Sequence, residues 1–273
     1  MAVILLFLLF LFTSSTATAQ PKHINITLES SLSATTQPTS WLSPSRLFGF
    51  GFYREGTSFK VGIWLETSPN KTTVWTANRD DPPVSGNSTL VLMNNGLFLK
   101  TAGVPDMIIS GNISPLPVYS ASMLDSGNLV LYNSDYKSIW ESFNYPTDTI
   151  LWGQSLLPNN QLFSSASETD HSTGGFQLSM QTDSNLVLYP KDTGNTPGDA
   201  YWATGTNKPG NTLRLQLYQD GSLYLVNATG YNTSIVARRA VANNGIVIYR
   251  ATLNVDGISA CIPTASHGAV SQQ

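Results

Sequence analysis

The chain lacks most of the side chains on which catalysis, metal binding or nucleic-acid binding depend. Its 273 residues include one cysteine, three histidines and 11% charged residues, with a net charge of −3. A single cysteine cannot form an intrachain disulfide, so Cys261 is expected to be a free or intermolecular thiol, in the simplest case an exposed tail residue without function. A chain without a basic stripe is a poor binder of nucleic acids or anionic membranes. The composition favours a β-rich extracellular domain with a neutral polar surface.

Long hydrophobic runs are also missing, apart from one at the N-terminus. Residues 3–12 are uniformly apolar, and a small-residue stretch follows that ends in Ala17-Thr18-Ala19. This pattern predicts a signal peptide over residues 1–19 with cleavage before Gln20. The run is too short to anchor the chain in a bilayer, and no later segment is long enough. We therefore expect a secreted protein without a membrane span.

Catalytic motifs are absent from the sequence as well. It has no His-x-x-x-His pair, Cys-x-x-Cys, Walker loop or Gly-x-Ser-x-Gly elbow. The contiguous triple Asp170-His171-Ser172 is expected to be a polar loop, because adjacent residues rarely converge into a triad. Most acidic residues lie in turns, where aspartate serves the backbone. We expect no enzyme activity, no cofactor and no metal.

Glycosylation is predicted from six Asn-x-Ser/Thr sequons, which become acceptors if the chain is exported. Pro115 makes the fourth sequon the poorest candidate. The acceptor asparagines are Asn25, Asn70, Asn87, Asn112, Asn227 and Asn232.

The body of the chain consists of short alternating runs separated by Gly, Asn, Asp, Ser and Pro, which is typical of an all-β fold without helices. Strands are expected at 47–53, 60–64, 72–77, 89–93, 96–100, 129–132, 176–180, 186–189, 213–218, 223–226 and 246–253. Several share a Leu-x-Leu core, which indicates an internal repeat. Three tryptophans, Trp75, Trp140 and Trp202, follow repeat strands and are expected to pack in the core rather than bind a ligand.

The most informative stretch is residues 181–189, Gln-Thr-Asp-Ser-Asn-Leu-Val-Leu-Tyr. If it is one extended strand, alternation with a period of two places five residues on one face and two leucines on the other. That face offers amides, a carboxylate, a phenol and an apolar contact, which together suit the hydroxyls and ring carbons of a sugar. The five residues are Gln181, Asp183, Asn185, Val187 and Tyr189.

The pattern Gln-x-Asp-x-Asn-x-Val-x-Tyr resembles the mannose-binding signature of the bulb-type lectins at every position. The resemblance implies that these five residues bind mannose without a metal. Longer motifs then extend it to the ectodomain of plant G-type lectin S-receptor-like serine/threonine kinases. These motifs lie at 49–53, 61–64, 74–80, 125–131 and 140–149.

This wider resemblance implies two tandem β-prism II domains of short antiparallel sheets. We expect them at residues 21–149 and 156–256, with a connection at 146–153 and a strandless polar tail at 257–273. Cys-rich modules, a membrane helix and a kinase follow in such receptors and do not appear in this sequence. The chain is therefore expected to be a lectin-only product, and a truncated gene model or an alternative transcript would look the same.

Two other copies of the sugar motif are degenerate. In the first domain, Met123 stands where Gln would be, and an extra residue separates Asp125 from Asn128, ahead of Tyr132. The third copy keeps Asp220 and Tyr224 but lacks the asparagine. Only the copy at 181–189 is expected to bind.

Two functions are predicted as alternatives. The first is a secreted, apoplastic lectin for mannose-containing glycans, in defence or cell-surface recognition, with avidity from several sites or a dimer. The second is a receptor-ectodomain interaction module that pairs with receptor-like kinases or with itself and binds no sugar. The intact copy favours the first function, whereas the degenerate copies favour the second.

Overall fold

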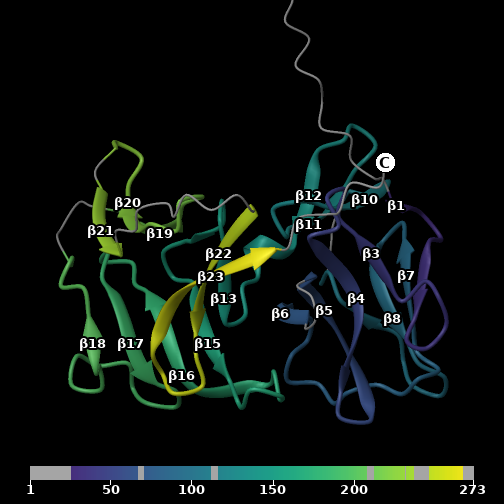
Figure 1. The fold of residues 1–273 in the computed structure, drawn as a ribbon, viewed down its shortest axis with the longest axis horizontal. Coiled ribbons are helices and arrows are strands. Elements are labelled where there is room, and N and C mark those ends of the chain that lie inside the picture. The colour runs from purple at the N-terminus through teal and green to yellow at the C-terminus, as the bar shows by residue number, and fades with distance from the viewer. Residues whose placement is uncertain are drawn as a thin grey trace, which may run out of the picture.

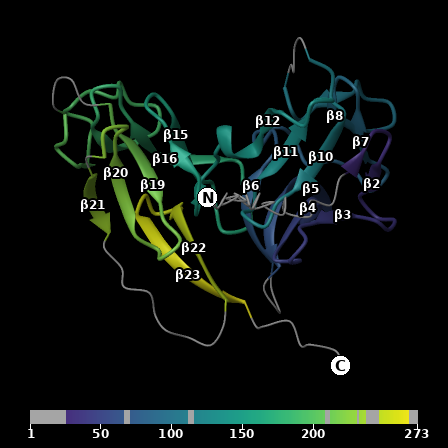
Figure 2. The same ribbon diagram turned by 90° about the horizontal axis from the view of Figure 1, so that it is seen from above.

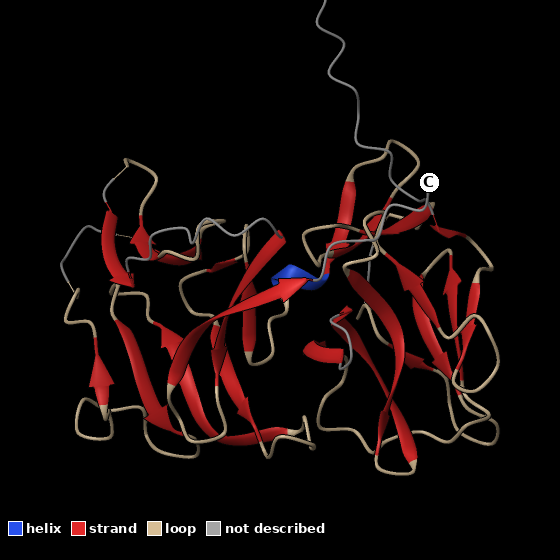
Figure 3. Ribbon diagram, viewed as in Figure 1, coloured by secondary structure: helices blue, strands red, loops and turns tan. Residues whose placement is uncertain are grey.

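The computed structural model describes residues 26–66, 71–111, 116–207, 212–230, 232–236 and 246–266, with the backbone alone at 232, 236, 246, 260, 261 and 263–266. These residues form strands, loops and one short 3₁₀ helix, η1 (Ser142–Asn144), which lies between the two halves of the molecule (Figure 3). No helix among them is long and apolar enough to cross a membrane.

Six antiparallel sheets divide the strands into two sets, which lie side by side in Figures 1 and 2. The first half holds three sheets of four strands. They are β1 (Ile26–Thr27), β10 (Ser120–Met123), β11 (Leu129–Tyr132) and β12 (Ser138–Glu141); β2 (Ser31–Ser33), β7 (Thr89–Met93), β8 (Gly96–Lys100) and β9 (Met107–Ile108); and β3 (Ser40–Leu42), β4 (Phe48–Glu55), β5 (Ser58–Glu66) and β6 (Lys71–Thr76).

The second half also holds three sheets, one of them with three strands. They are β13 (Thr149–Leu151), β22 (Ile246–Leu253) and β23 (Ser259–Ser266); β14 (Ser155–Leu156), β19 (Arg214–Leu217), β20 (Leu223–Val226) and β21 (Asn232–Val236); and β15 (Gln161–Ser165), β16 (Thr173–Met180), β17 (Leu186–Pro190) and β18 (Trp202–Ala203). Three small sheets in each half give the β-prism II architecture, which confirms the expected fold class.

Every strand expected from alternation is present, with limits shifted by a few residues. The strands that were missed are short edge strands or polar ones, such as β10, whose sequence is Ser-Ala-Ser-Met. The expectation of a strandless tail was wrong, because residues 259–266 form β23 and pair along the whole of β22. Trp75 and Trp140 are buried with ring centroids 6.3 Å apart, whereas Trp202 is 41% exposed because it lies on an edge strand.

Each half has its own apolar core, and one sheet contributes to both cores. In the sheet β13–β22–β23, Ile150 and Tyr249 pack into the core of the second half. Their neighbours Leu151 and Ile248 pack into the core of the first half. Alternation along a strand sends successive side chains to opposite faces, so this sheet is covered on both sides and joins the two halves.

The guanidinium of Arg79, in the loop after β6, forms the densest polar contact between the halves. Its Nε donates to the His171 carbonyl at 2.8 Å, and its terminal nitrogens donate to the carbonyls of Phe163, Ser164 and Ser172 at 2.9, 3.0 and 3.1 Å. Burial lowers the pKa of Arg79, and the carboxylates of Asp148 and Asp80 act in the opposite direction. Five donors in a fixed fork suit this array of carbonyls.

Further contacts across the junction involve the loop 166–172. Asp80 accepts hydrogen bonds from Thr173 N at 2.7 Å and Thr173 Oγ1 at 2.8 Å. Desolvation raises the pKa of Asp80, but these bonds together with the charges of Arg79 and Lys60 lower it below its ordinary value. The imidazole of His171 lies edge-on to Tyr53, and the backbone N–H of His171 donates to Glu55 at 3.2 Å. The expectation that Asp170-His171-Ser172 is a loop is confirmed.

Replacing Arg79 with lysine tests this junction. Lysine keeps the charge but cannot reach four carbonyls at once, so Arg79→Lys should lower the free energy of unfolding by about 3 kcal/mol as buried acceptors lose their partners. Denaturant unfolding measures the loss. Arg54→Lys is the matched control, because Arg54 is exposed and contacts only the ring of Phe59 among the interactions described. Equal effects of the two substitutions would contradict the assigned role.

Candidate functional site

The predicted sugar motif is not one extended strand. Residues 181–185 form the turn between β16 and β17, closed by hydrogen bonds from Gln181 N to the Asn185 carbonyl at 2.9 Å and from Ser184 N to the Gln181 carbonyl at 3.1 Å. Only Leu186–Pro190 is strand. The single-face arrangement of all five residues is therefore wrong, because turn hydrogen bonds override strict alternation before residue 186.

The same turn recurs in four other hairpins of the described residues. Backbone bonds of the same two kinds close the turns 124–128, 133–137, 218–222 and 254–258. The fourth residue has a positive φ in each: 87° at Gly127, 58° at Tyr136, 81° at Gly221 and 79° at Gly257. In the second half, the third residue is an aspartate that accepts the backbone N–H two positions on: Asp183 at 3.0 Å, Asp220 at 2.9 Å and Asp256 at 2.9 Å.

This equivalence corrects the alignment of the first-domain copy. Met123 and Met180 occupy matching positions, since each pairs with the first residue of the next strand. Leu124, not Met123, therefore corresponds to Gln181, and the turn has no extra residue. The aspartate is the second residue of this turn rather than the third, and Asp125 accepts a hydrogen bond from Ser45 N at 2.8 Å. Ser126 takes over the bond to the backbone of residue 128, at 3.4 Å.

Ser184 has a side chain at φ 77° where three of the other turns have glycine and the turn 133–137 has Tyr136. Such a conformation is costly for a residue with a Cβ. The surroundings hold Ser184 in place: its Oγ accepts from Leu213 N at 3.1 Å, and its carbonyl accepts from Thr206 Oγ1 at 2.6 Å. This turn is thus fixed on the side away from the groove described next.

A polar groove of about 330 Å³ opens beside the turn. Gln181, Asp183 and Tyr189 line it, and Gln181 Nε2 donates to the Tyr189 hydroxyl at 2.9 Å. Asp183 is exposed, whereas Tyr189 is 2% exposed, so the ring is held while the carboxylate faces water. The buried Ser179 Oγ, also in the lining, has no hydrogen-bond partner among the described residues.

The other two predicted residues do not line the groove. Asn185 Oδ1 accepts from Thr204 Oγ1 at 3.0 Å and from Thr206 N at 3.3 Å, which ties the turn to the segment after β18. Val187 is 2% exposed and pairs with Ser179 of β16. Sequence reasoning missed Thr182 within the stretch and Ser179 and Met180 directly before it. It also missed three lining residues from other segments, namely Asn159, Gln161 and Asn195. No local pattern links these segments to 181–189, apart from the polar run before β15.

The residues of the degenerate copies have structural partners. Asn128 is buried, accepts from Ser142 Oγ at 3.1 Å and Phe143 N at 3.2 Å, and donates to Glu141 at 3.0 Å. Burial, and to a smaller extent the negative charge of Glu141, raises the pKa of Tyr132. Tyr224 packs edge-on against Tyr218 at 5.4 Å.

Several predictions cannot be placed on this structure. The signal peptide, Asn25, Asn70 and Asn112 lie outside the described residues, as do the side chains of Asn232 and Cys261. Asn87 is exposed and Asn227 half-buried, and Asn227 accepts from Thr229 of its own sequon. Glycosylation at these sites stays a prediction.

The six small sheets and the recurring turn define an all-β protein of the β-prism II class. Residues 72–169 match the model of the family described as D-mannose binding lectin. The chain is 35% identical over 266 residues to the G-type lectin S-receptor-like serine/threonine-protein kinase LECRK3 of Oryza sativa subsp. indica, a match that covers 92% of this chain and 31% of that protein.

A second relative is the receptor-like serine/threonine-protein kinase SD1-7 of Arabidopsis thaliana, 36% identical over 152 residues, 52% of this chain and 18% of that protein. The chain spans about a third of the length of the first relative. Among solved structures, the mannose-specific agglutinin from snowdrop (Galanthus nivalis) complexed with methyl-α-D-mannoside is 23% identical, with a TM-score of 0.34, over 46% of this chain and 98% of that one. The lectin from Colocasia esculenta is 26% identical, with a TM-score of 0.33, over 45% and 94%.

The recurring turn can be tested at Gly257, where a Cβ would lie 2.7 Å from the ring of Phe176. Gly257→Ala should destabilise the protein by about 2–4 kcal/mol, from backbone strain and overpacking together. Thermal or denaturant unfolding checks this. Gly175→Ala, with open space at its Cβ, is the control. A neutral effect at Gly257 would contradict the positive φ.

Proposed function

We propose that the chain is a mannose-type lectin whose sugar site is the groove beside the turn 181–185. The observation that carries the proposal is the convergence of Gln181, Asp183 and Tyr189 on one open polar groove. The description of the matching family, D-mannose binding lectin, favours mannose as the monosaccharide.

Asp183 is the expected main contact, since a carboxylate accepts from two vicinal hydroxyls and charge-assisted bonds are about twice as strong as neutral ones. One Asp183 oxygen already accepts from Asn185 N, which fixes the carboxylate before the ligand arrives. Gln181 and Tyr189 are likewise held against each other. Preorganised polar groups reduce the entropic cost of binding.

Asn185 and Val187 support the site without lining the groove. Asn185 holds the turn to Thr204 and Thr206, and Val187 is buried and pairs with Ser179 of the groove lining. This division of roles differs from the one that the family resemblance implies, in which all five residues touch the sugar. A single shallow site binds with a dissociation constant on the order of millimolar, so useful avidity needs a dimer or a multivalent glycan.

We further propose that the protein acts outside the cell, exported by the N-terminal signal peptide, as a glycoprotein in surface recognition or defence. The similarity to receptor-like kinases supports this setting. Receptor-like kinases or a second copy of the chain are the proposed protein partners.

The alternative function is a protein-interaction module without sugar binding. The engagement of Asn185 and Val187 favours it, because only three of the five motif residues reach the groove. The sugar titration below separates the two.

Isothermal titration with methyl α-mannoside and a branched high-mannose glycan tests the groove. The Asp183→Ala protein should bind the sugar at least about tenfold more weakly, equivalent to about 1.4 kcal/mol, because it lacks a charge-assisted contact. Asp220→Ala is the matched control, because Asp220 makes the equivalent hydrogen bond in the turn 218–222 and does not line this groove.

Binding that is equal in wild type, Asp183→Ala and Asp220→Ala would refute the assigned site. A folded wild type without any binding would favour the interaction module.

A further inference from the structure

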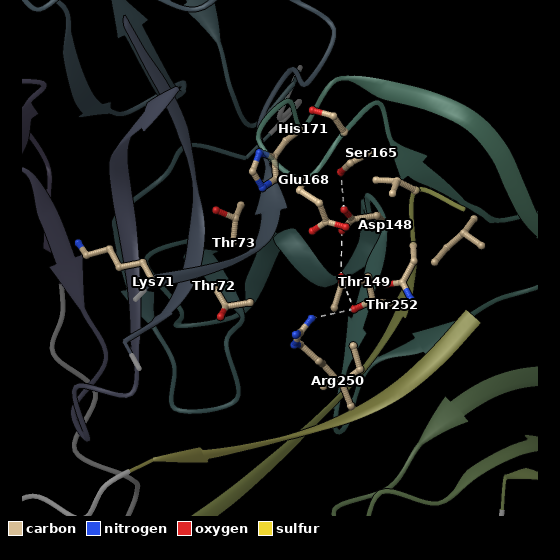
Figure 4. A pocket seen from close by; sticks show the side chains of 15 residues that line it. Lys71, Thr72, Thr73, Asp148, Thr149, Ser165, Glu168, His171, Arg250 and Thr252 are labelled. Carbon is tan, nitrogen blue, oxygen red and sulfur yellow. Dashed lines mark hydrogen bonds between the residues drawn. The ribbon is translucent and has the colours of Figure 1, made fainter. Parts of the chain in front are cut away.

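A second polar cavity, of about 400 Å³, lies at the junction of the two halves, away from the groove at 181–189 (Figure 4). Thr72 and Thr73 of β6 contribute from the first half. Thr149, Arg250 and Thr252 contribute from the face of the sheet β13–β22–β23 that looks towards the first half. Both halves therefore form the cavity together.

Its walls offer donors and acceptors that the protein does not use up. Asp148 accepts one bond at each oxygen, from Thr149 Oγ1 at 2.9 Å and Ser165 Oγ at 2.7 Å. A carboxylate has about four acceptor sites, so each oxygen can accept again. Arg250 donates from one terminal nitrogen to Thr252 Oγ1 at 3.2 Å, which leaves further donors of its five.

The guanidinium of the half-buried Arg250 is incompletely satisfied. Its Nε is one of four buried side-chain polar atoms without a hydrogen-bond partner among the described residues. Burial lowers the pKa of Arg250, and Asp148 and Glu168 counter this. The terminal nitrogens keep unused N–H donors, so this wall is suited to a polar ligand that supplies acceptors.

The charges in the lining cancel. Two cations, Lys71 and Arg250, stand against two carboxylates, Asp148 and Glu168. The Lys71 ammonium is already engaged, 3.3 Å from Glu66 and 4.2 Å from the centroid of the Trp64 ring. A net-neutral site gives no advantage to an ion but suits a ligand whose groups both donate and accept.

We propose that this interdomain cavity is a second binding site, for a neutral saccharide unit. Adjacent hydroxyls donate to Asp148 and Glu168 and accept from Arg250, while Val255 and Ile262 offer apolar contact to the ring. The volume lies within the range of small-molecule sites. The proposal is independent of the groove at 181–189.

Saturation-transfer NMR on the Asp183→Ala protein isolates the cavity. The probes are the methyl glycosides of mannose, glucose and galactose, with glucuronate and glucosamine as charged counterparts. We expect saturable binding of at least one methyl glycoside at millimolar concentration, and weaker binding of both charged probes. Glu168→Gln, at an exposed position, should weaken binding about threefold, and Arg250→Gln about tenfold.

Arg214→Gln is the matched control, since this half-buried arginine bonds Gln216 on another sheet and should leave binding unchanged. The proposal would be overturned if no methyl glycoside binds saturably or if a charged probe binds more tightly. It would also be overturned if Glu168→Gln and Arg250→Gln leave binding as it is in the Asp183→Ala protein. If the groove at 181–189 is inactive, wild type and Asp183→Ala still bind equally and Arg250→Gln still loses binding, so the two failures are distinguishable.

Discussion

The insertion of Arg79 into carbonyls of the second half is the contact on which the arrangement of the two halves depends. The Arg79 carbonyl accepts from Lys60 Nζ at 2.7 Å, and Lys60 lies 3.4 Å from Glu55. Glu55 in turn accepts from the backbone of His171. The loop 166–172, which connects β15 to β16, is thus held by a network rooted in β4 and β5. An arginine in this role is cheaper to desolvate than a lysine, because its charge is delocalised and weakly hydrated.

The junction also determines the surroundings of the sheet β13–β22–β23. Its outer face would meet water in an isolated domain, but here Leu151 and Ile248 are buried in the core of the first half. Polar residues on the same face, including Arg250 and Thr252, line the cavity at the junction. The turn 254–258 has the same backbone hydrogen bonds as the turn 181–185. It joins β22 to β23, which pair along their whole length.

Alternation of apolar residues was enough to predict the all-β class and the long strands, because each such strand buries one face. The short polar strands escaped, since Ser120–Met123 is buried by its position between β1 and β11 rather than by its composition. The tail strand β23 was missed because it carries few large apolar residues and is defined by its pairing with β22.

The candidate site was predictable in part. The motif located the right hairpin, but alternation could not foresee the turn that directs Asn185 away from Asp183, nor the lining residues contributed by Asn159 and Asn195. Arg79 belongs to a motif that the resemblance had already identified, but its partners, such as Phe163 and Ser172, are about 90 residues away in sequence. Contacts of that range depend on how the two halves dock, which local patterns do not encode.

The most direct measurement is an amide NMR titration of the protein with methyl α-mannoside, followed residue by residue. The account predicts saturable shifts centred on Gln181–Asn185 and Tyr189, extending to Asn159 and Gln161, with the turns 124–128 and 218–222 unaffected. Shifts centred on those other turns, or no shifts in a folded protein, would contradict it.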